Sequence, residues 1–315
     1  MKYPISREFF PYTHFTAPIS PAFLKLAAMG MKKTPGFVFK DPALHVESRL
    51  IPGYQGGRIE LLILSPQNLP ARAPCLVDIH GGGFVLEGGP SHYRMAMAYA
   101  KQAQCRVIYV RYRLAPEYPF PVPQEDCYAA LCWTYDHADE LDIDRNRIGV
   151  AGDSAGATLA VAACLMARDR GHAVKPLFQM LVYPFLDGRN GREGWPGSES
   201  FNRFTDTPMW NSTLSRKVGR FTTPVPEATP LAYRSPVEAD SLDGMPPAYV
   251  EVAEFDCLHD DGVLYAELLR QNGTEVRLHE VKGAMHGFDT KTSAPASQKM
   301  VAQRSEYMKT MFSSN

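Results

Sequence analysis

The sequence of 315 residues predicts an α/β fold with a mostly parallel central sheet flanked by helices. Short apolar runs recur along it and are near-continuous, which is typical of strands whose two faces are both covered by helices. Longer segments with helical spacing lie between these runs, and this alternation favours a parallel sheet between two helical layers.

The apolar runs, bounded by turn residues, predict strands at 59–64, 75–79, 105–110, 148–151, 179–183, 248–253 and 276–281. The segments with apolar residues three or four positions apart predict helices at 124–137, 155–170, 260–271 and 298–312.

Two regions do not follow this alternation, residues 1–50 and 186–240. Both contain clustered glycine, proline and aromatic residues without strand periodicity. Neither is long enough to bury much surface alone. We therefore expect 51–315 to form the main domain, 1–50 to be an N-terminal cap segment, and 186–240 to be a helical cap region inserted into the main domain.

The charge balance excludes some classes of partner. The chain has 33 basic and 34 acidic residues, so no bulk field attracts nucleic acid or an anionic membrane. Its longest stretch of small apolar residues, 155–167, is shorter than the roughly 20 residues that span a bilayer. Residues 1–15 lack the apolar run of a secretory signal peptide.

The six cysteines indicate a reducing compartment and no metal site. They lie mostly inside apolar runs, without a CxxC pair and without histidines at zinc-binding spacing. Buried reduced thiols are typical of cytoplasmic proteins. We therefore expect a cytoplasmic protein without metal or cofactor.

The motif Gly152-Asp153-Ser154-Ala155-Gly156 joins an expected strand directly to an expected helix. A G-x-S-x-G sequence in this position is typical of a nucleophile elbow, in which a sharp turn exposes the serine hydroxyl. The backbone N–H of Ala155 would be an unpaired donor at the positive end of the helix dipole. The alternative is a turn that caps the helix and has no chemical role.

A second motif, His80-Gly81-Gly82-Gly83-Phe84, follows the expected strand 75–79. Consecutive glycines leave the backbone amides free to approach a ligand closely, at a cost in chain entropy. A flexible turn is the alternative interpretation. Together with YRLAPE at 112–117, these motifs resemble those of the hormone-sensitive-lipase-like esterases, also called bacterial lipolytic family IV.

The resemblance extends from about residue 73 to residue 288 and implies an α/β-hydrolase fold, with 51–315 as its catalytic domain. It also implies an oxyanion hole formed by the amides of Gly82, Gly83 and Ala155. Which two of the three consecutive glycines donate stays open at this point.

A serine hydroxyl needs a base and a group that orients the base. In this fold the chain order is serine, acid, histidine, with the last two on loops after late strands. His286 follows the last expected strand and matches the family's HGF segment, whereas His279 lies inside that strand and is expected to be a packing or surface residue.

Asp256 is the expected acid because it comes directly after the strand at 248–253. Asp260 and Asp261 are alternatives, but they fall at the start of the next helix, where acids are ordinary first-turn residues. The family usually has proline where this chain has Cys257, which changes a turn residue and leaves the carboxylate in place.

Other polar residues of these motifs have structural interpretations. We expect His80 to brace the glycine loop, Asp153 to hold backbone amides, and His259 to be a cap or surface residue. The remaining polar residues of the family motifs are expected to form scaffolding beneath the glycine loop: Tyr112, Arg113, Glu117 and Asp126.

The predicted function is a serine carboxylesterase that forms an acyl-enzyme. The resemblance implies a small ester of acetyl to about hexanoyl length as substrate, and we expect no nucleic-acid or membrane partner; a homodimer stays open. An amidase or acylaminoacyl peptidase on the same fold is an alternative. A non-catalytic receptor of the gibberellin-receptor type is another, but those receptors lack the catalytic histidine and His286 is present.

Overall fold

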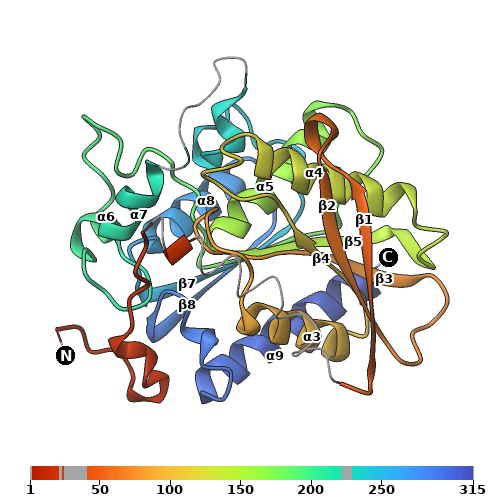
Figure 1. Ribbon diagram of the computed structural model, residues 1–315, viewed down its shortest axis with the longest axis horizontal. Helices are drawn as coiled ribbons and strands as arrows, with labels where there is room; N and C mark the ends of the chain where they lie inside the picture. The colour runs from red at the N-terminus through yellow and green to blue at the C-terminus, as the bar shows by residue number, and fades with distance from the viewer. Residues whose placement is uncertain (1, 21–22, 25–40, 221, 223–228, 315) are drawn as a thin grey trace.

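An eight-stranded sheet forms the centre of the molecule, in the order β1-β2-β4-β3-β5-β6-β7-β8 (Figure 1). The computed structural model describes residues 2–20, 23–24, 41–220, 222 and 229–314. Strand β2 is antiparallel to both neighbours, and the strands from β4 to β8 pair in parallel. The expected mostly parallel sheet is confirmed.

The strands are β1 (Leu44–Pro52), β2 (Arg58–Pro66), β3 (Ala73–Ile79), β4 (Arg106–Arg111), β5 (Ile143–Asp153), β6 (Gln179–Val182), β7 (Ala248–Phe255) and β8 (Val276–Met285). The α-helices in the described ranges are α3 (Pro90–Ala103), α4 (Val122–Asp136), α5 (Ala155–Asp169), α6 (Glu199–Arg203), α7 (Ser212–Gly219), α8 (His259–Gln271) and α9 (Pro295–Ser313). The short 3₁₀ turns η3 (Tyr54–Gly56) and η4 (Leu231–Tyr233) matter below.

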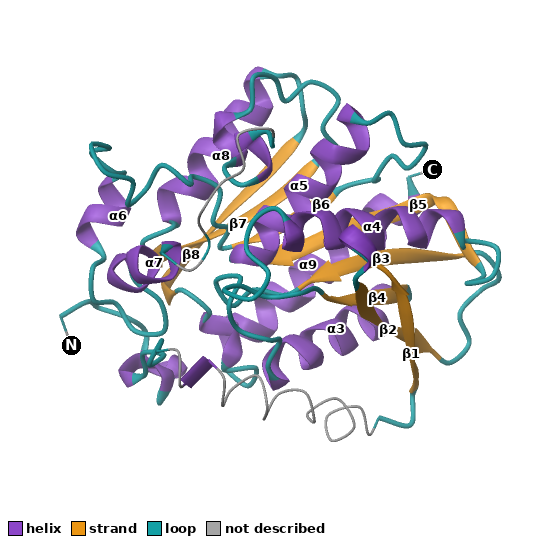
Figure 2. Ribbon diagram, turned by 45° about the horizontal axis from the view of Figure 1, so that its top comes forward, coloured by secondary structure: helices purple, strands orange, loops and turns teal. Residues whose placement is uncertain are grey.

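Both faces of the sheet are covered, which explains the near-continuous apolar strands. Along β3, Val77 packs into the core shared with α4, α5 and α8, whereas its neighbour Leu76 packs into the core shared with α3 and α9. Figure 2 shows these two groups of helices on opposite sides of the sheet. No helix in the described ranges is long and apolar enough to cross a membrane.

Each expected strand and helix overlaps an observed one, but two elements were not predicted. Helix α3 was not expected between β3 and β4. Strand β1 crosses the boundary expected between residues 50 and 51, so the end of the expected N-terminal segment forms the edge of the sheet. The view that residues 1–50 lack a strand was therefore wrong.

The N-terminal residues lie against the region 186–240. Thr16 forms a parallel β-bridge with Met209, and the ammonium group of Lys2 lies 2.8 Å from a carboxylate oxygen of Asp206. Figure 1 shows the N-terminal segment beside α6 and α7, at the end of the sheet where β7 and β8 lie. Parts of the two expected cap segments, residues 25–40 and 223–228, lie outside the described residues.

Candidate active site

Ser154 lies on a sharp turn between β5 and α5. Its backbone has φ 54° and ψ −120°, a combination that a non-glycine residue holds only where the surrounding structure enforces it. The helix crosses the end of β3 so closely that a Cβ at Gly156 would lie 2.1 Å from the carbonyl oxygen of Ile79. The turn therefore needs glycine after the serine, and it presents the hydroxyl at the end of the sheet.

Ser154, His286 and Asp256 form a continuous chain of hydrogen bonds. The Ser154 hydroxyl donates to Nε2 of His286 at 2.9 Å, and Nδ1 of His286 donates to Oδ2 of Asp256 at 2.7 Å. The second Asp256 oxygen accepts from the backbone N–H of Leu258 at 2.9 Å. Because Asp256 is fully buried, its carboxylate is held by these bonds and fixes the orientation of the imidazole.

The strands explain why these three residues meet. Ser154 follows β5, Asp256 follows β7, and His286 follows β8, and the carboxyl ends of parallel strands share one edge of the sheet. His279 points elsewhere, because it lies within β8 and stacks on Tyr249 with ring centroids 4.7 Å apart.

The two alternative acids anchor other parts of the chain. Asp261 accepts hydrogen bonds from the backbone N–H groups of Leu186 and Asp187, and Asp260 accepts from the backbone N–H of Ser200. Both lie in the first turn of α8, as expected. They hold the start of the 186–240 region and do not bond to the imidazole.

Among the described residues, only one of the three amides of the glycine loop has a hydrogen-bond acceptor. The N–H of Gly81 donates to Oδ1 of Asp153 at 3.0 Å. Within the described ranges, no acceptor is bonded to the amides of Gly82, Gly83 or Ala155. The amide of Gly81 is already hydrogen-bonded to Asp153, whereas those of Gly82 and Gly83 have no acceptor among the described residues. Gly82 and Gly83 are therefore the two glycines of the loop that could donate to an oxyanion.

Buried polar residues brace this loop from behind. Nδ1 of His80 donates to the carbonyl oxygen of Gly81 at 2.7 Å, and the Tyr112 hydroxyl donates to that of His80 at 2.8 Å. The two rings stack with centroids 4.4 Å apart. Burial lowers the pKa of His80 to about 4, so the ring is neutral and has a structural role.

Arg113 and Asp126 form a second scaffold. The guanidinium donates to both carboxylate oxygens, at 2.8 and 2.7 Å, and Asp126 also accepts from the backbone N–H of Tyr54. This network ties the segment after β4 to α4 and η3. Glu117 is exposed instead, so its expected place in the scaffold was wrong. His259 is the first residue of α8, and its ring hydrogen-bonds the carboxylate of Asp260. The N-cap of this helix is Leu258, so the expectation that His259 caps the helix was wrong.

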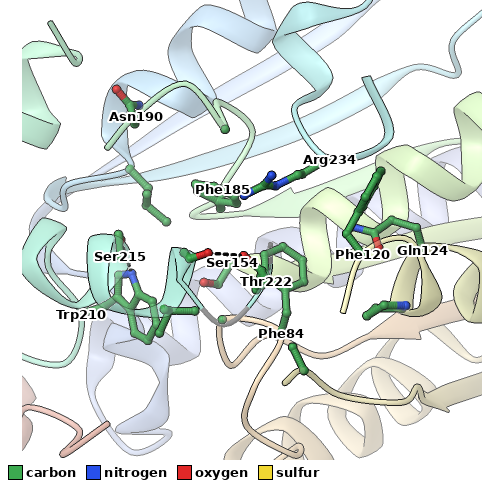
Figure 3. Close-up of a pocket in the computed structure, with 18 residues that line it drawn as sticks. Phe84, Phe120, Gln124, Ser154, Phe185, Asn190, Trp210, Ser215, Thr222 and Arg234 are labelled. Atoms are coloured by element: carbon green, nitrogen blue, oxygen red, sulfur yellow. Dashed lines mark hydrogen bonds between the residues drawn. The ribbon is translucent and has the colours of Figure 1, made fainter. Parts of the chain in front are cut away.

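A pocket of about 740 Å³, including its open mouth, lies directly over Ser154. Its walls near the serine are mostly apolar: Phe84, Phe120, Phe185, Trp210, Val218 and Leu258 (Figure 3). Sequence reasoning noted Trp210 only as one of a cluster of aromatic residues, and it did not identify the polar lining residues Gln124 and Arg234. No cluster of side chains suited to a metal ion occurs in the described ranges.

Comparisons with known proteins identify the family to which this chain is similar. The family model described as alpha/beta hydrolase fold matches residues 76–290. Carboxylesterase NlhH of Mycobacterium tuberculosis is 36% identical over 285 residues, covering 89% of this chain and 85% of its own. Esterase LipI of the same organism is 36% identical over 251 residues, covering 78% of this chain and 76% of its own.

Solved structures extend the agreement over the whole chain. A bacterial heroin esterase superposes with a TM-score of 0.88 at 31% identity, with full coverage of both chains. A hyperthermophilic esterase from Pyrobaculum calidifontis gives a TM-score of 0.80 at 32% identity, covering 94% of this chain and 99% of its own.

The chain belongs to the α/β-hydrolase family, within its hormone-sensitive-lipase-like (family IV) carboxylesterases. Carboxylic ester hydrolysis is accordingly its class of reaction.

Proposed function

We propose that the enzyme hydrolyses esters of short to medium acyl groups, acetyl to about hexanoyl, through an acyl-enzyme intermediate. Ser154 is the nucleophile, His286 the base, and Asp256 the acid that orients the base. The observation that carries this proposal is the chain of hydrogen bonds from the serine hydroxyl through the imidazole to a buried carboxylate.

In the first step, His286 Nε2 takes the hydroxyl proton as the Ser154 oxygen attacks the ester carbonyl. The oxyanion that forms accepts hydrogen bonds from the amides of Gly82, Gly83 and Ala155, each worth about 2.7–4 kcal/mol in such sites. The imidazolium then gives its proton to the leaving alcohol oxygen, and the acyl group remains on the serine.

In the second step, water loses a proton to His286 and attacks the acyl carbonyl, and the carboxylic acid leaves as Ser154 regains its proton. Asp256 stays ionised throughout.

The apolar walls of the pocket support a substrate with a short hydrocarbon acyl group. We further propose that the N-terminal segment and the region 186–240 together form the cap over it, because Trp210 and Val218 of that region line the pocket and Thr16 pairs with Met209.

A cytoplasmic location belongs to the same proposal. All six cysteines are free, and five of them are buried. Burial raises the pKa of the Cys75 thiol to about 12 and that of Cys164 likewise, so both are unreactive near neutral pH.

The test is Ser154→Ala, assayed on 4-nitrophenyl esters from acetate to dodecanoate. Turnover should fall to a small residual rate while the folded state is retained, and the wild-type enzyme should be most active on acyl groups up to about hexanoyl. Asp256→Asn provides a second variant, expected to lower kcat by about 10⁴ through loss of the imidazole orientation. Substantial turnover by Ser154→Ala would contradict the assignment.

Two further measurements address the other activities. Matched 4-nitroanilides test amide hydrolysis, and faster turnover of the anilide than of the ester would favour an amidase. An organophosphate should label Ser154, and failure to react would favour a non-catalytic binding protein.

A further inference from the structure

Among the residues that the structure describes, one cation that faces the pocket has no anionic partner. Arg234 follows η4, is half-buried, and lines the pocket over Ser154. Within the described ranges, its guanidinium takes part in no ion pair and no hydrogen bond. Figure 3 shows the side chain extending into the pocket toward Phe185. A guanidinium at this depth has lost part of its hydration and gained no counter-charge.

The nearby charges do not neutralise it. Among the described residues, the carboxylate of Glu238 favours the charged form of Arg234. Both oxygens of this carboxylate, however, already accept hydrogen bonds from Arg192, at 3.1 and 2.9 Å. Arg189 is likewise paired with Asp187, through two bonds of 2.8 Å. Burial, and then the like charge of Arg192, lower the pKa of Arg234. An arginine stays protonated at neutral pH even so, and no carboxylate among the described residues is bonded to Arg234.

The backbone that carries Arg234 is held firmly. Tyr233 is buried, and its hydroxyl donates to a carboxylate oxygen of Asp169 on α5 at 3.0 Å. On the other side of Arg234, the Ser235 hydroxyl accepts from the backbone N–H of Gly188 at 2.8 Å. Since both neighbours are fixed, the guanidinium is presented to the pocket from a rigid position, as a recognition group requires.

A second polar group without a partner lines the same pocket. Gln124 is 2% exposed, and its side-chain oxygen Oε1 has no hydrogen-bond partner in the described part of the chain. Figure 3 shows it beside Phe120. A buried amide oxygen without a donor is costly, and a bound ligand with an O–H or N–H group would satisfy it. The pocket thus combines an apolar wall near the serine with polar groups that have no partner among the residues that the structure describes.

We infer that Arg234 binds a carboxylate of the substrate, so that the enzyme prefers esters carrying a carboxylate on the group that enters this pocket. The inference rests on the proposed esterase function. A carboxylate matches the planar guanidinium through two parallel hydrogen bonds, which makes it the anion best suited to this residue.

The experiment compares matched ester pairs that differ only in the charge. For the acyl side, the pair is mono-(4-nitrophenyl) adipate and its methyl-capped form. For the alcohol side, it is 4-acetoxybenzoate and methyl 4-acetoxybenzoate. Each is assayed with the wild-type enzyme and with Arg234→Met, and the change in kcat/KM is compared within each pair, which cancels intrinsic differences in ester reactivity.

In one pair, Arg234→Met should lower kcat/KM about 10- to 100-fold more for the carboxylate than for the methyl ester, the effect expected of a charge-assisted hydrogen bond. The pair that responds identifies which part of the ester meets Arg234. Arg234→Lys should retain part of the preference, because it keeps the charge and loses the paired geometry. Lys217→Met, which removes an exposed charge from α7, should alter neither pair.

Equal losses within both pairs, or no loss in either, would overturn the inference. If the wild-type enzyme hydrolysed neither the methyl-capped esters nor 4-nitrophenyl acetate, the proposed esterase function would fail instead. A second measurement needs no variant. Monomethyl adipate and 4-hydroxybenzoate should inhibit 4-nitrophenyl acetate hydrolysis at lower concentration than their uncharged amides, and equal inhibition by acid and amide would contradict the role of Arg234.

Discussion

Gly83 offers a sharp test of the oxyanion loop, because Gly83→Ala adds a methyl group at a crowded place. Its backbone has φ +62°, and an added Cβ would lie 2.6 Å from Cη2 of Trp210. An ordinary carbon contact is about 3.5–4.0 Å, so the loop or the ring must shift by about 1 Å. Trp210 cannot swing aside freely, since its Nε1 donates to the Ser215 hydroxyl at 2.7 Å.

The expected loss of activity follows from that shift. A displacement of about 1 Å at a catalytic group can lower the rate about 10²-fold. Complete loss of one oxyanion donor lowers kcat by about 10²–10³. We therefore expect Gly83→Ala to reduce kcat on 4-nitrophenyl acetate by about 10²–10³, with a smaller change in KM. The left-handed backbone adds a separate cost of about 1–2 kcal/mol to folding.

Gly56→Ala is the matched control. Gly56 has φ +73°, and an added Cβ there meets nothing within 4 Å. It carries the same backbone cost without the steric one, so urea unfolding should show a similar loss of stability while kcat stays normal. If Gly83→Ala kept kcat within about threefold of the wild type, the amide of Gly83 would not belong to the oxyanion hole, since losing a donor costs far more.

Two further predictions concern buried charges. Arg304→Met should lower the free energy of unfolding by about 3–5 kcal/mol, measured in urea, because it leaves two buried carboxylates without their cation. Burial, and then repulsion from Asp153, raise the pKa of Asp78 from 3.8 to about 7. The folded protein therefore binds a proton there that the unfolded chain releases, and its stability falls as pH rises through this window. Asp78→Asn should be neutral near pH 4 and stabilising near pH 8, by up to about 4 kcal/mol.

Each of these has its own control. Lys309→Met removes an exposed cation from α9, the helix that carries Arg304, and should change the stability by less than about 0.5 kcal/mol. A stability loss for Arg304→Met as small as this would refute the buried-charge argument. For Asp78→Asn, a stability difference from wild type that stays constant between pH 4 and pH 8 would show that the pKa of Asp78 is not raised in the folded protein.

The strands that sequence reasoning predicted are those buried on both faces, where apolar residues run without interruption. Strand β1 was not predicted because it is an edge strand, paired on one side only, with the charged residues Glu47 and Arg49 near its middle. The sequence of such a strand resembles that of a polar loop, because much of the strand is exposed to solvent. Its register depends on β2, which local sequence does not specify.

Helix α3 was not predicted for a different reason. Its buried positions are filled by Tyr93, Ala96 and Ala100, and small or aromatic residues give a weaker helical pattern than leucine or valine. The candidate triad was predictable because each member follows a strand and the fold dictates their order. The position of Arg234 in the pocket was not predictable, because the sequence does not show which residues surround a side chain in the folded protein.

Asp153 connects the turn that carries Ser154 to the glycine loop. It directly precedes Ser154 in the chain, and its carboxylate holds the first amide of the glycine loop. In the proposed mechanism, the attacking oxygen and the amides that stabilise the oxyanion are therefore tied to the same residue, the first through the chain and the second through this hydrogen bond. Trp210 and Arg234, which line the pocket, lie on other segments, so a substitution at either leaves this connection in place.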